Sequence, residues 1–148
     1  MPIIALDIRG FSMSENKDRI LVVEDSPPNR KILVHLLEKL NYVVDSFEDG
    51  KEAWDYLNDN PPSDLVAIIS DIMMPQMDGV QLLKHVREDD KWKDMPFVLV
   101  TAVSDRDYII EAKALNVNGY ILKPVTFQRV TNKLKEIFPE KKFPKAAS

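Results

Sequence analysis

The chain has 148 residues, the usual size of one domain, and 45% of them are hydrophobic, so we expect one core without a second globular unit. It has no cysteine and two histidines, which excludes disulfides and a cysteine nucleophile and leaves too few ligands for most zinc sites. The net charge of −4, the lack of a long apolar run and the lack of a signal-peptide pattern predict a cytoplasmic protein that binds neither nucleic acid nor membranes.

Short apolar runs alternate with segments in which apolar residues follow helical spacing. In chain order, we expect strand 20–23, helix 30–40, strand 42–44, helix 50–57, strand 65–69, helix 80–87, strand 97–100, helix 107–115, strand 120–122 and helix 130–137. Ser26 before two prolines, and Asp49 before Gly50, are typical of helix starts. This alternation predicts an α/β fold with a doubly wound, five-stranded parallel sheet and five flanking helices.

Four of these strands end in a side chain that can carry chemistry. Glu24 and Asp25 follow the first strand, Asp71 follows the third, Thr101 ends the fourth and Lys123 follows the fifth. Since ligands of open parallel sheets bind beyond the carboxyl ends of the strands, we expect these five residues to share one crevice.

Three carboxylates in one crevice call for a cation or for raised pKa values, because two like charges about 4 Å apart repel by about 4 kcal/mol at an effective dielectric near 20. All-oxygen ligands favour Mg²⁺. Each residue also has an ordinary structural interpretation. Glu24 and Asp25 could cap the next helix, Asp71 could belong to a turn, Lys123 could be solvated and Thr101 could bond to backbone. The joint pattern makes these interpretations improbable.

Four motifs resemble the receiver domain of bacterial response regulators, the proteins of two-component signal transduction. They are RILVVED at residues 19–25, SDIMMPQMDG at 70–79, VTA at 100–102 and GYILKP at 119–124. The resemblance covers residues 19–138 and implies a flavodoxin-like fold with strand order 2-1-3-4-5. It also implies a cis peptide bond between Lys123 and Pro124.

The resemblance assigns a role to each matching position. Asp71 corresponds to the phosphoacceptor, and Thr101 and Lys123 to the groups that act on the phosphoryl oxygens. Thr101 and Tyr120 correspond to the switch pair. The Mg²⁺ ligands implied by the family are Glu24, Asp25, Asp71 and the backbone carbonyl of Met73.

These roles predict a single-domain, phosphoprotein switch that is not an enzyme beyond its own phosphorylation and slow dephosphorylation. A histidine kinase or a histidine phosphotransfer protein would donate to Asp71 with Mg²⁺ as the cofactor. Nothing resembling an output domain follows Ile137, so the chain is expected to bind an unknown downstream protein or to pass its phosphoryl group on in a phosphorelay. We place an N-terminal extension at residues 1–18, the receiver domain at 19–138 and a basic, frayed tail at 139–148.

Two other functions remain as alternatives. A protein-interaction module of the same fold could work without phosphorylation. A Mg²⁺-dependent phosphatase of the haloacid dehalogenase type needs a second aspartate two residues after the first. Here position 73 is methionine, so the general acid of that family is absent.

Met73 and Val103 replace the polar residues that fast chemotaxis-type receivers carry beside the phosphoryl group, so we expect a long-lived phosphoryl group.

Overall fold

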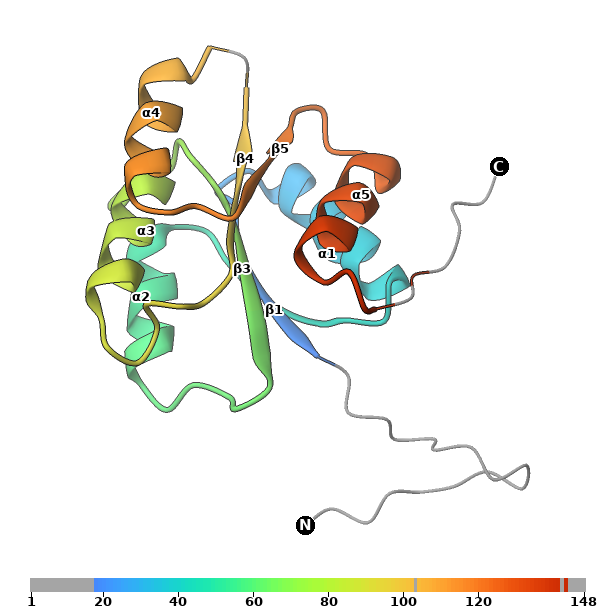
Figure 1. The fold of residues 1–148 in the computed structure, drawn as a ribbon, viewed down its shortest axis with the longest axis horizontal. Helices are drawn as coiled ribbons and strands as arrows, with labels where there is room; N and C mark the ends of the chain where they lie inside the picture. The colour runs from blue at the N-terminus through green and yellow to red at the C-terminus, as the bar shows by residue number, and fades with distance from the viewer. Residues whose placement is uncertain (1–17, 103, 142, 144–148) are drawn as a thin grey trace.

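The five strands pair in parallel in the order β2-β1-β3-β4-β5, which the resemblance to receiver domains implies (Figure 1). The computed structural model describes residues 18–102, 104–141 and 143. The strands are β1 (Arg19–Val23), β2 (Val43–Phe47), β3 (Leu65–Asp71), β4 (Phe97–Thr101) and β5 (Gly119–Leu122). The helices are α1 (Pro27–Lys39), α2 (Gly50–Asn58), α3 (Gly79–Glu88), α4 (Arg106–Ala114) and α5 (Phe127–Ile137).

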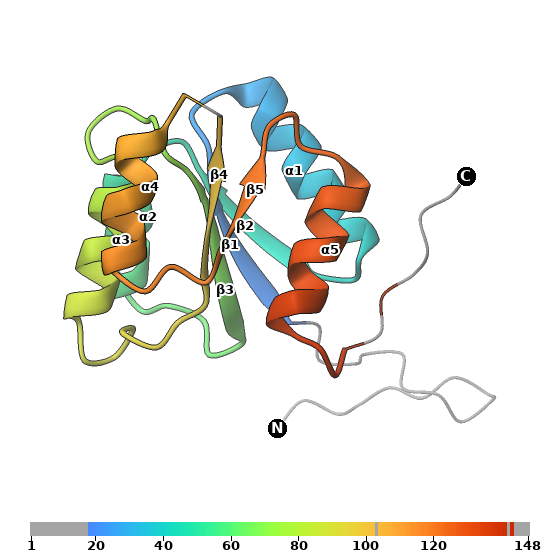
Figure 2. The ribbon, with the colours of Figure 1, turned by 45° about the horizontal axis from the view of Figure 1, so that its top comes forward.

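Both faces of the sheet are covered, because alternate strand residues point to opposite sides. Helices α1 and α5 lie on one face, and α2, α3 and α4 lie on the other (Figures 1 and 2). In β1, Ile20 and Val22 belong to the core beneath α1 and α5, whereas Leu21 and Val23 belong to the core beneath the other three helices. None of the helices within the described part of the chain is long and apolar enough to cross a membrane.

Polar residues just after the strands begin the next helices. The Ser26 hydroxyl accepts a hydrogen bond from the Asn29 amide, and Asp49 accepts one from the Glu52 amide at 2.8 Å. Asp78 and Gln81 form a reciprocal capping box at the start of α3. These caps fix the turns that follow the strand ends, so they also position the side chains at that edge of the sheet.

Strand β2 is longer and lies later in the sequence than residues 42–44. It continues through Asp45 and Ser46 because it is an edge strand, where polar side chains are tolerated. Asp45 accepts hydrogen bonds from Arg19 and from the Tyr56 hydroxyl. Tyr42 instead lies outside the strand and is buried in the core.

The described part of the C-terminal tail packs against the domain and does not fray there. The Lys141 ammonium lies 3.9 Å from the Tyr42 ring centroid and 3.1 Å from a carboxylate oxygen of Asp18. The Phe143 ring lies 6.4 Å from the Tyr42 ring. The expected N-terminal extension lies outside the described residues except for Asp18.

Arg87, near the end of α3, uses all five guanidinium donors. It donates to the backbone carbonyls of Lys93, Met95, Leu115 and Asn116 and to the side chain of Asn118, over distances of 2.8 to 3.1 Å. These contacts join α3 to the loop before β4 and to the C-terminal end of α4.

Candidate functional site

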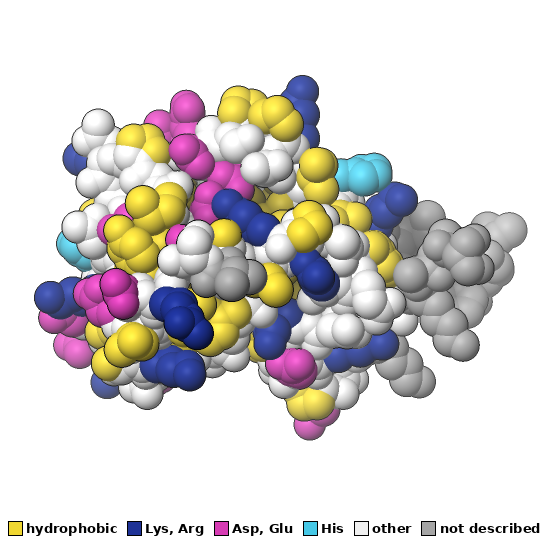
Figure 3. All heavy atoms as spheres, turned by 90° about the horizontal axis from the view of Figure 1, so that it is seen from above, with side chains coloured by type: hydrophobic (Ala, Val, Ile, Leu, Met, Phe, Trp, Pro, Cys, Tyr) yellow, Lys and Arg dark blue, Asp and Glu magenta, His cyan; other side chains and the backbone are white. Residues whose placement is uncertain are grey.

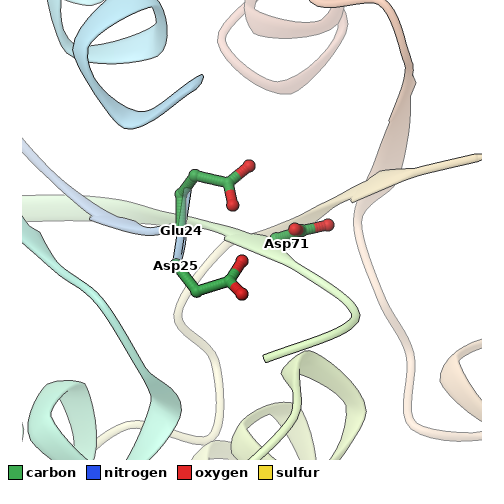
Figure 4. Close-up of side chains that lie close together, drawn as sticks. All are labelled: Glu24, Asp25 and Asp71. Atoms are coloured by element: carbon green, nitrogen blue, oxygen red, sulfur yellow. The ribbon is translucent and has the colours of Figure 1, made fainter. Parts of the chain in front are cut away.

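The acidic cluster forms at the carboxyl end of the sheet, as the sequence predicts. Glu24 and Asp25 leave the end of β1, Asp71 ends β3, and their side chains surround one small space (Figure 4). One carboxylate oxygen from each residue lies within 4.8 Å of those of the other two. Viewed from above, acidic side chains gather at one place on this face, beside basic ones (Figure 3).

Two members of the cluster are largely removed from water. Glu24 is 4% exposed and Asp71 is 5% exposed, whereas Asp25 is exposed. Burial raises the pKa of Glu24 to about 8; the Ser26 amide, which donates to its carboxylate at 3.1 Å, opposes this rise, and the charge of Asp71 adds to it. The site therefore holds more negative charge than its protein neighbours neutralise, which is the environment that a divalent cation relieves.

Lys123 reaches Asp71 from the loop after β5. Its Nζ lies 3.0 Å from Oδ1 of Asp71, and the Ile72 amide donates to the same oxygen at 2.9 Å. Burial lowers the pKa of Lys123, but the hydrogen bond to Asp71 and the charges of Asp71, Glu24 and Asp105 outweigh it, so that the pKa is raised. Lys123 is therefore a cation throughout the neutral range.

Thr101 is buried at the end of β4, where Val100 is in register with Asp71. Its hydroxyl lies 3.0 Å from the Ala102 carbonyl oxygen and 3.1 Å from Oδ2 of Asp105. The hydroxyl thus lies at the predicted edge of the sheet, but its partners here belong to the loop that leads into α4.

Tyr120 lies on β5 and connects this edge to α4. It is half-buried, and its hydroxyl donates to the Ile109 carbonyl at 3.4 Å. Burial raises the pKa of its phenol. The switch role of Thr101 and Tyr120 stays a prediction, and their position between the acidic edge and α4 is consistent with it.

Two further expectations concern residues near the acidic cluster. The peptide bond between Lys123 and Pro124 is cis, which confirms the expectation from the resemblance. The Met73 side chain is 52% exposed, and the role of its backbone carbonyl as a ligand stays a prediction. Val103 lies outside the described residues.

The sequence analysis did not single out Asp105, although it contacts Thr101. Its position just before α4 is that of an ordinary helix-capping residue. A carboxylate four residues after a strand-end threonine was the only available signal, and it does not distinguish a cap from a contact with β4.

A cavity of about 470 Å³ opens beside the cluster. Glu24 and Lys123 form part of its wall, and the remainder is largely apolar, with Asn29, Ile32, Pro124 and Val125. Ile32, on α1, is 48% exposed. A protein partner that reached Asp71 from this side would therefore meet an apolar surface next to the charged site.

The strand order and the acidic cluster beyond the carboxyl ends of β1 and β3 are those of a flavodoxin-like signalling receiver. The chain matches the response regulator receiver domain family over residues 20–135, and it belongs to that family. Members of the family act as phosphoacceptor switches and not as enzymes in the usual sense.

Chemotaxis proteins are among its relatives. The chain is 39% identical over 121 residues to the chemotaxis protein CheY homolog of Campylobacter jejuni, which covers 80% of this chain and 91% of that protein. It is 38% identical over 120 residues to chemotaxis protein CheY1 of Helicobacter pylori, covering 80% of this chain and 95% of that one.

Solved receiver structures share the fold. The chemotaxis response regulator CheY4 of Vibrio cholerae superposes with a TM-score of 0.74 and 28% identity, covering 82% of this chain and 99% of that chain. The receiver domain of a sensor histidine kinase from Pseudomonas aeruginosa, whose structure has a magnesium ion coordinated in the active site cleft, has a TM-score of 0.71 and 25% identity. That match covers 80% of this chain and 95% of the other.

Proposed function

We propose that this chain is a response regulator that accepts a phosphoryl group on Asp71 from the phosphohistidine of a histidine kinase or histidine phosphotransfer protein. The observation that carries the proposal is the meeting of Glu24, Asp25 and Asp71 within 4.8 Å, with the Lys123 ammonium 3.0 Å from Asp71. An aspartate beside a cation site and a lysine is suited to attack phosphorus and to form an acyl phosphate.

The contacts of Asp71 indicate which oxygen reacts. Both Lys123 and the Ile72 amide bind Oδ1, so we infer that Oδ2 attacks phosphorus. The bond between phosphorus and the histidine nitrogen breaks as the new bond between oxygen and phosphorus forms, and the histidine keeps the electron pair. Lys123 and the Thr101 hydroxyl stabilise the charge on the phosphoryl oxygens.

The donor set fits Mg²⁺ as the cofactor. Glu24, Asp25, Asp71 and the Met73 carbonyl would hold it, all through oxygen atoms, in a site where burial alone would keep Glu24 protonated. When bound, the ion neutralises charge on the transferring phosphoryl group.

The output of this switch would be a change in protein binding. As the phosphoryl group draws in Thr101, Tyr120 moves, and the surface of α4, β5 and α5 changes. This surface carries two exposed apolar side chains, Ile110 at 68% and Leu122 at 40%, which suit an unknown downstream protein partner.

The test is to incubate the protein with acetyl phosphate or phosphoramidate and Mg²⁺ and to measure its mass. We expect a gain of one phosphoryl group that is absent in Asp71→Asn. If the wild type gains no mass, and if the wild type and Asp71→Asn bind a protein partner equally well, the phosphorylation-independent module is supported instead.

A further inference from the structure

Asp105 holds two hydrogen-bond donors at the end of β4. Its Oδ2 accepts from the Ala102 amide at 2.8 Å and lies 3.1 Å from the Thr101 hydroxyl oxygen. Both donors belong to the strand end that lies beside Asp71, since Asp71 is in register with Val100. A carboxylate outside the acidic cluster is therefore bound to two groups at the end of the strand that pairs with the end of β3.

This arrangement differs from that of the other helix starts. Ser26, Asp49, Asp78 and Thr126 each accept a hydrogen bond from an amide of the helix that they precede. Asp105 occupies the same position before α4, but its side chain makes no such bond. Its carboxylate turns back toward β4, so α4 begins without a side-chain cap and is instead linked to Thr101 and Ala102.

The two donors cannot serve Asp105 and a phosphoryl group at once. The Thr101 hydroxyl has one proton, for which the Asp105 carboxylate at 3.1 Å and the Ala102 carbonyl oxygen at 3.0 Å are both acceptors, and the Ala102 amide also has one. A phosphoryl oxygen and a carboxylate oxygen are both anionic acceptors that form charge-assisted bonds with such donors. The negative charge of Asp105 also contributes to the raised pKa of Lys123, the residue that binds Asp71.

We propose that Asp105 is an internal competitor of the phosphoryl group. In the unphosphorylated protein it binds the Thr101 hydroxyl and the Ala102 amide. A phosphoryl group on Asp71 takes these donors, and the displaced carboxylate releases the first turn of α4. This inference rests on the proposed function, and it identifies Asp105 as a positioning residue that sets how strongly phosphorylation is opposed and links it to α4.

The experiment is a titration with beryllofluoride, a phosphoryl analogue, at fixed Mg²⁺, followed through backbone amide resonances. Asp105→Ala should bind beryllofluoride about tenfold more tightly than the wild type, because no bound carboxylate has to be displaced. Asp105→Asn, which keeps the size but not the charge, should lie between them. The matched control is Asp107→Ala, which removes the same charge from an exposed position in the first turn of α4 and should bind as the wild type does.

Two readouts separate this role from a general effect on the fold. The Ala102 amide should exchange its hydrogen faster in Asp105→Ala than in the wild type, before any analogue is added. In a Thr101→Ala background the gain in affinity from Asp105→Ala should shrink, because one of the contested donors is gone.

Beryllofluoride binding by the wild type and by Asp105→Ala distinguishes failure of the competitor role from failure of the proposed function. If the wild type accepts a phosphoryl group from acetyl phosphate but binds beryllofluoride no more weakly than Asp105→Ala does, the competitor role of Asp105 is overturned and the proposed function stands. Binding by neither protein would reject both. Binding by Asp105→Ala alone would support the competitor and show that the wild type is blocked.

Discussion

At the scale of single residues, the acidic cluster joins three carboxyl groups, of which Asp25 is the exposed member. Asp25→Ala should weaken Mg²⁺ binding about tenfold or more and slow phosphorylation in parallel, while the fold stays intact. Its free energy of unfolding without Mg²⁺ should be unchanged or higher, since one repulsive charge is gone. Calorimetric Mg²⁺ titration and mass spectrometry measure the two effects, with the exposed Asp90→Ala as the control. A wild-type phosphorylation rate in Asp25→Ala would refute the metal site.

Glu24 should give the stability a distinctive pH dependence. Its pKa is about 8 in the folded protein and about 4.5 in the unfolded chain, so between these values the folded state holds a proton that the unfolded state has lost. The contribution of Glu24 to stability is therefore complete below pH 4.5 and declines up to about pH 8, with a slope of at most about 1.4 kcal/mol per pH unit.

The measurement is a series of urea titrations from pH 4.5 to 8.5 in the presence of a chelator, with Glu24→Gln as the reference. The difference in unfolding free energy between the two proteins should fall with pH and level off above pH 8. Saturating Mg²⁺ should flatten it. A difference that rises with pH would show that Glu24 is ionised in the folded protein.

The lifetime of the phosphoryl group is set by the residues that flank the approach of water. The family resemblance assigns Met73 and Val103 to these positions, and neither side chain can orient a water molecule by a hydrogen bond, so decay should be slow. In a Met73→Asn, Val103→Glu double variant we expect decay about tenfold faster or more after the donor is removed. Mass spectrometry over time gives both rates, and equal rates would mean that these residues only pack at the rim.

At the scale of elements, the start of α3 packs closely against the backbone of Asp71. A Cβ atom on Gly79 would clash with the backbone carbonyl oxygen of Asp71 and touch Leu99. Gly79→Ala should therefore cost about 1–3 kcal/mol of stability and slow phosphorylation by displacing Asp71. Gly119→Ala is the control, because the added carbon meets the flexible side chain of Lys133. Thermal unfolding measures the loss of stability, and mass spectrometry measures the phosphorylation rate. Equal effects of Gly79→Ala and Gly119→Ala would contradict the predicted clash with Asp71.

Most of the elements could be predicted because sequence and burial agree for them. Strands β1, β3 and β4 are largely apolar and are ended or followed directly by polar residues, and Ser26 and Asp49 mark the starts of α1 and α2. β2 was placed wrongly because Asp45 and Ser46 look like a turn, whereas at an edge they bind Arg19, Tyr56 or solvent. The extent of β2 could not be read from its sequence, because polar side chains are tolerated inside a strand at the open edge of a sheet.

In the candidate site, too, some features could be predicted from the sequence and others could not. The gathering of Glu24, Asp25, Asp71, Thr101 and Lys123 followed from where the strands end. The contact between Asp105 and the end of β4 could not be predicted, because it depends on which way one carboxylate turns at a helix start. The packing of Lys141 and Phe143 on Tyr42 likewise joins residues about a hundred positions apart, and composition alone suggested a loose end.

At the scale of the whole molecule, Arg87 connects the C-terminal end of α3 to the C-terminal end of α4 and to the loop before β4. Lysine has one ammonium in place of the planar fork and cannot reach five acceptors. Arg87→Lys should lower the free energy of unfolding by about 2 kcal/mol or more. Urea unfolding provides the value, with the exposed Arg106→Lys as the control, and a loss no larger than that of the control would show that the network contributes little.

The Arg87 network also determines what kind of motion α4 can make. Arg87 binds Leu115 and Asn116, directly after the last turn of α4, whereas Asp105 links the first turn to Thr101 and Ala102 through one carboxylate. A helix that is held by several hydrogen bonds at its C-terminal end and by one carboxylate at its N-terminal end should rotate about its C-terminal end. A small displacement of Asp105 should then move the exposed Ile110 more than Leu115, so the proposed switch would reorient α4 rather than translate it.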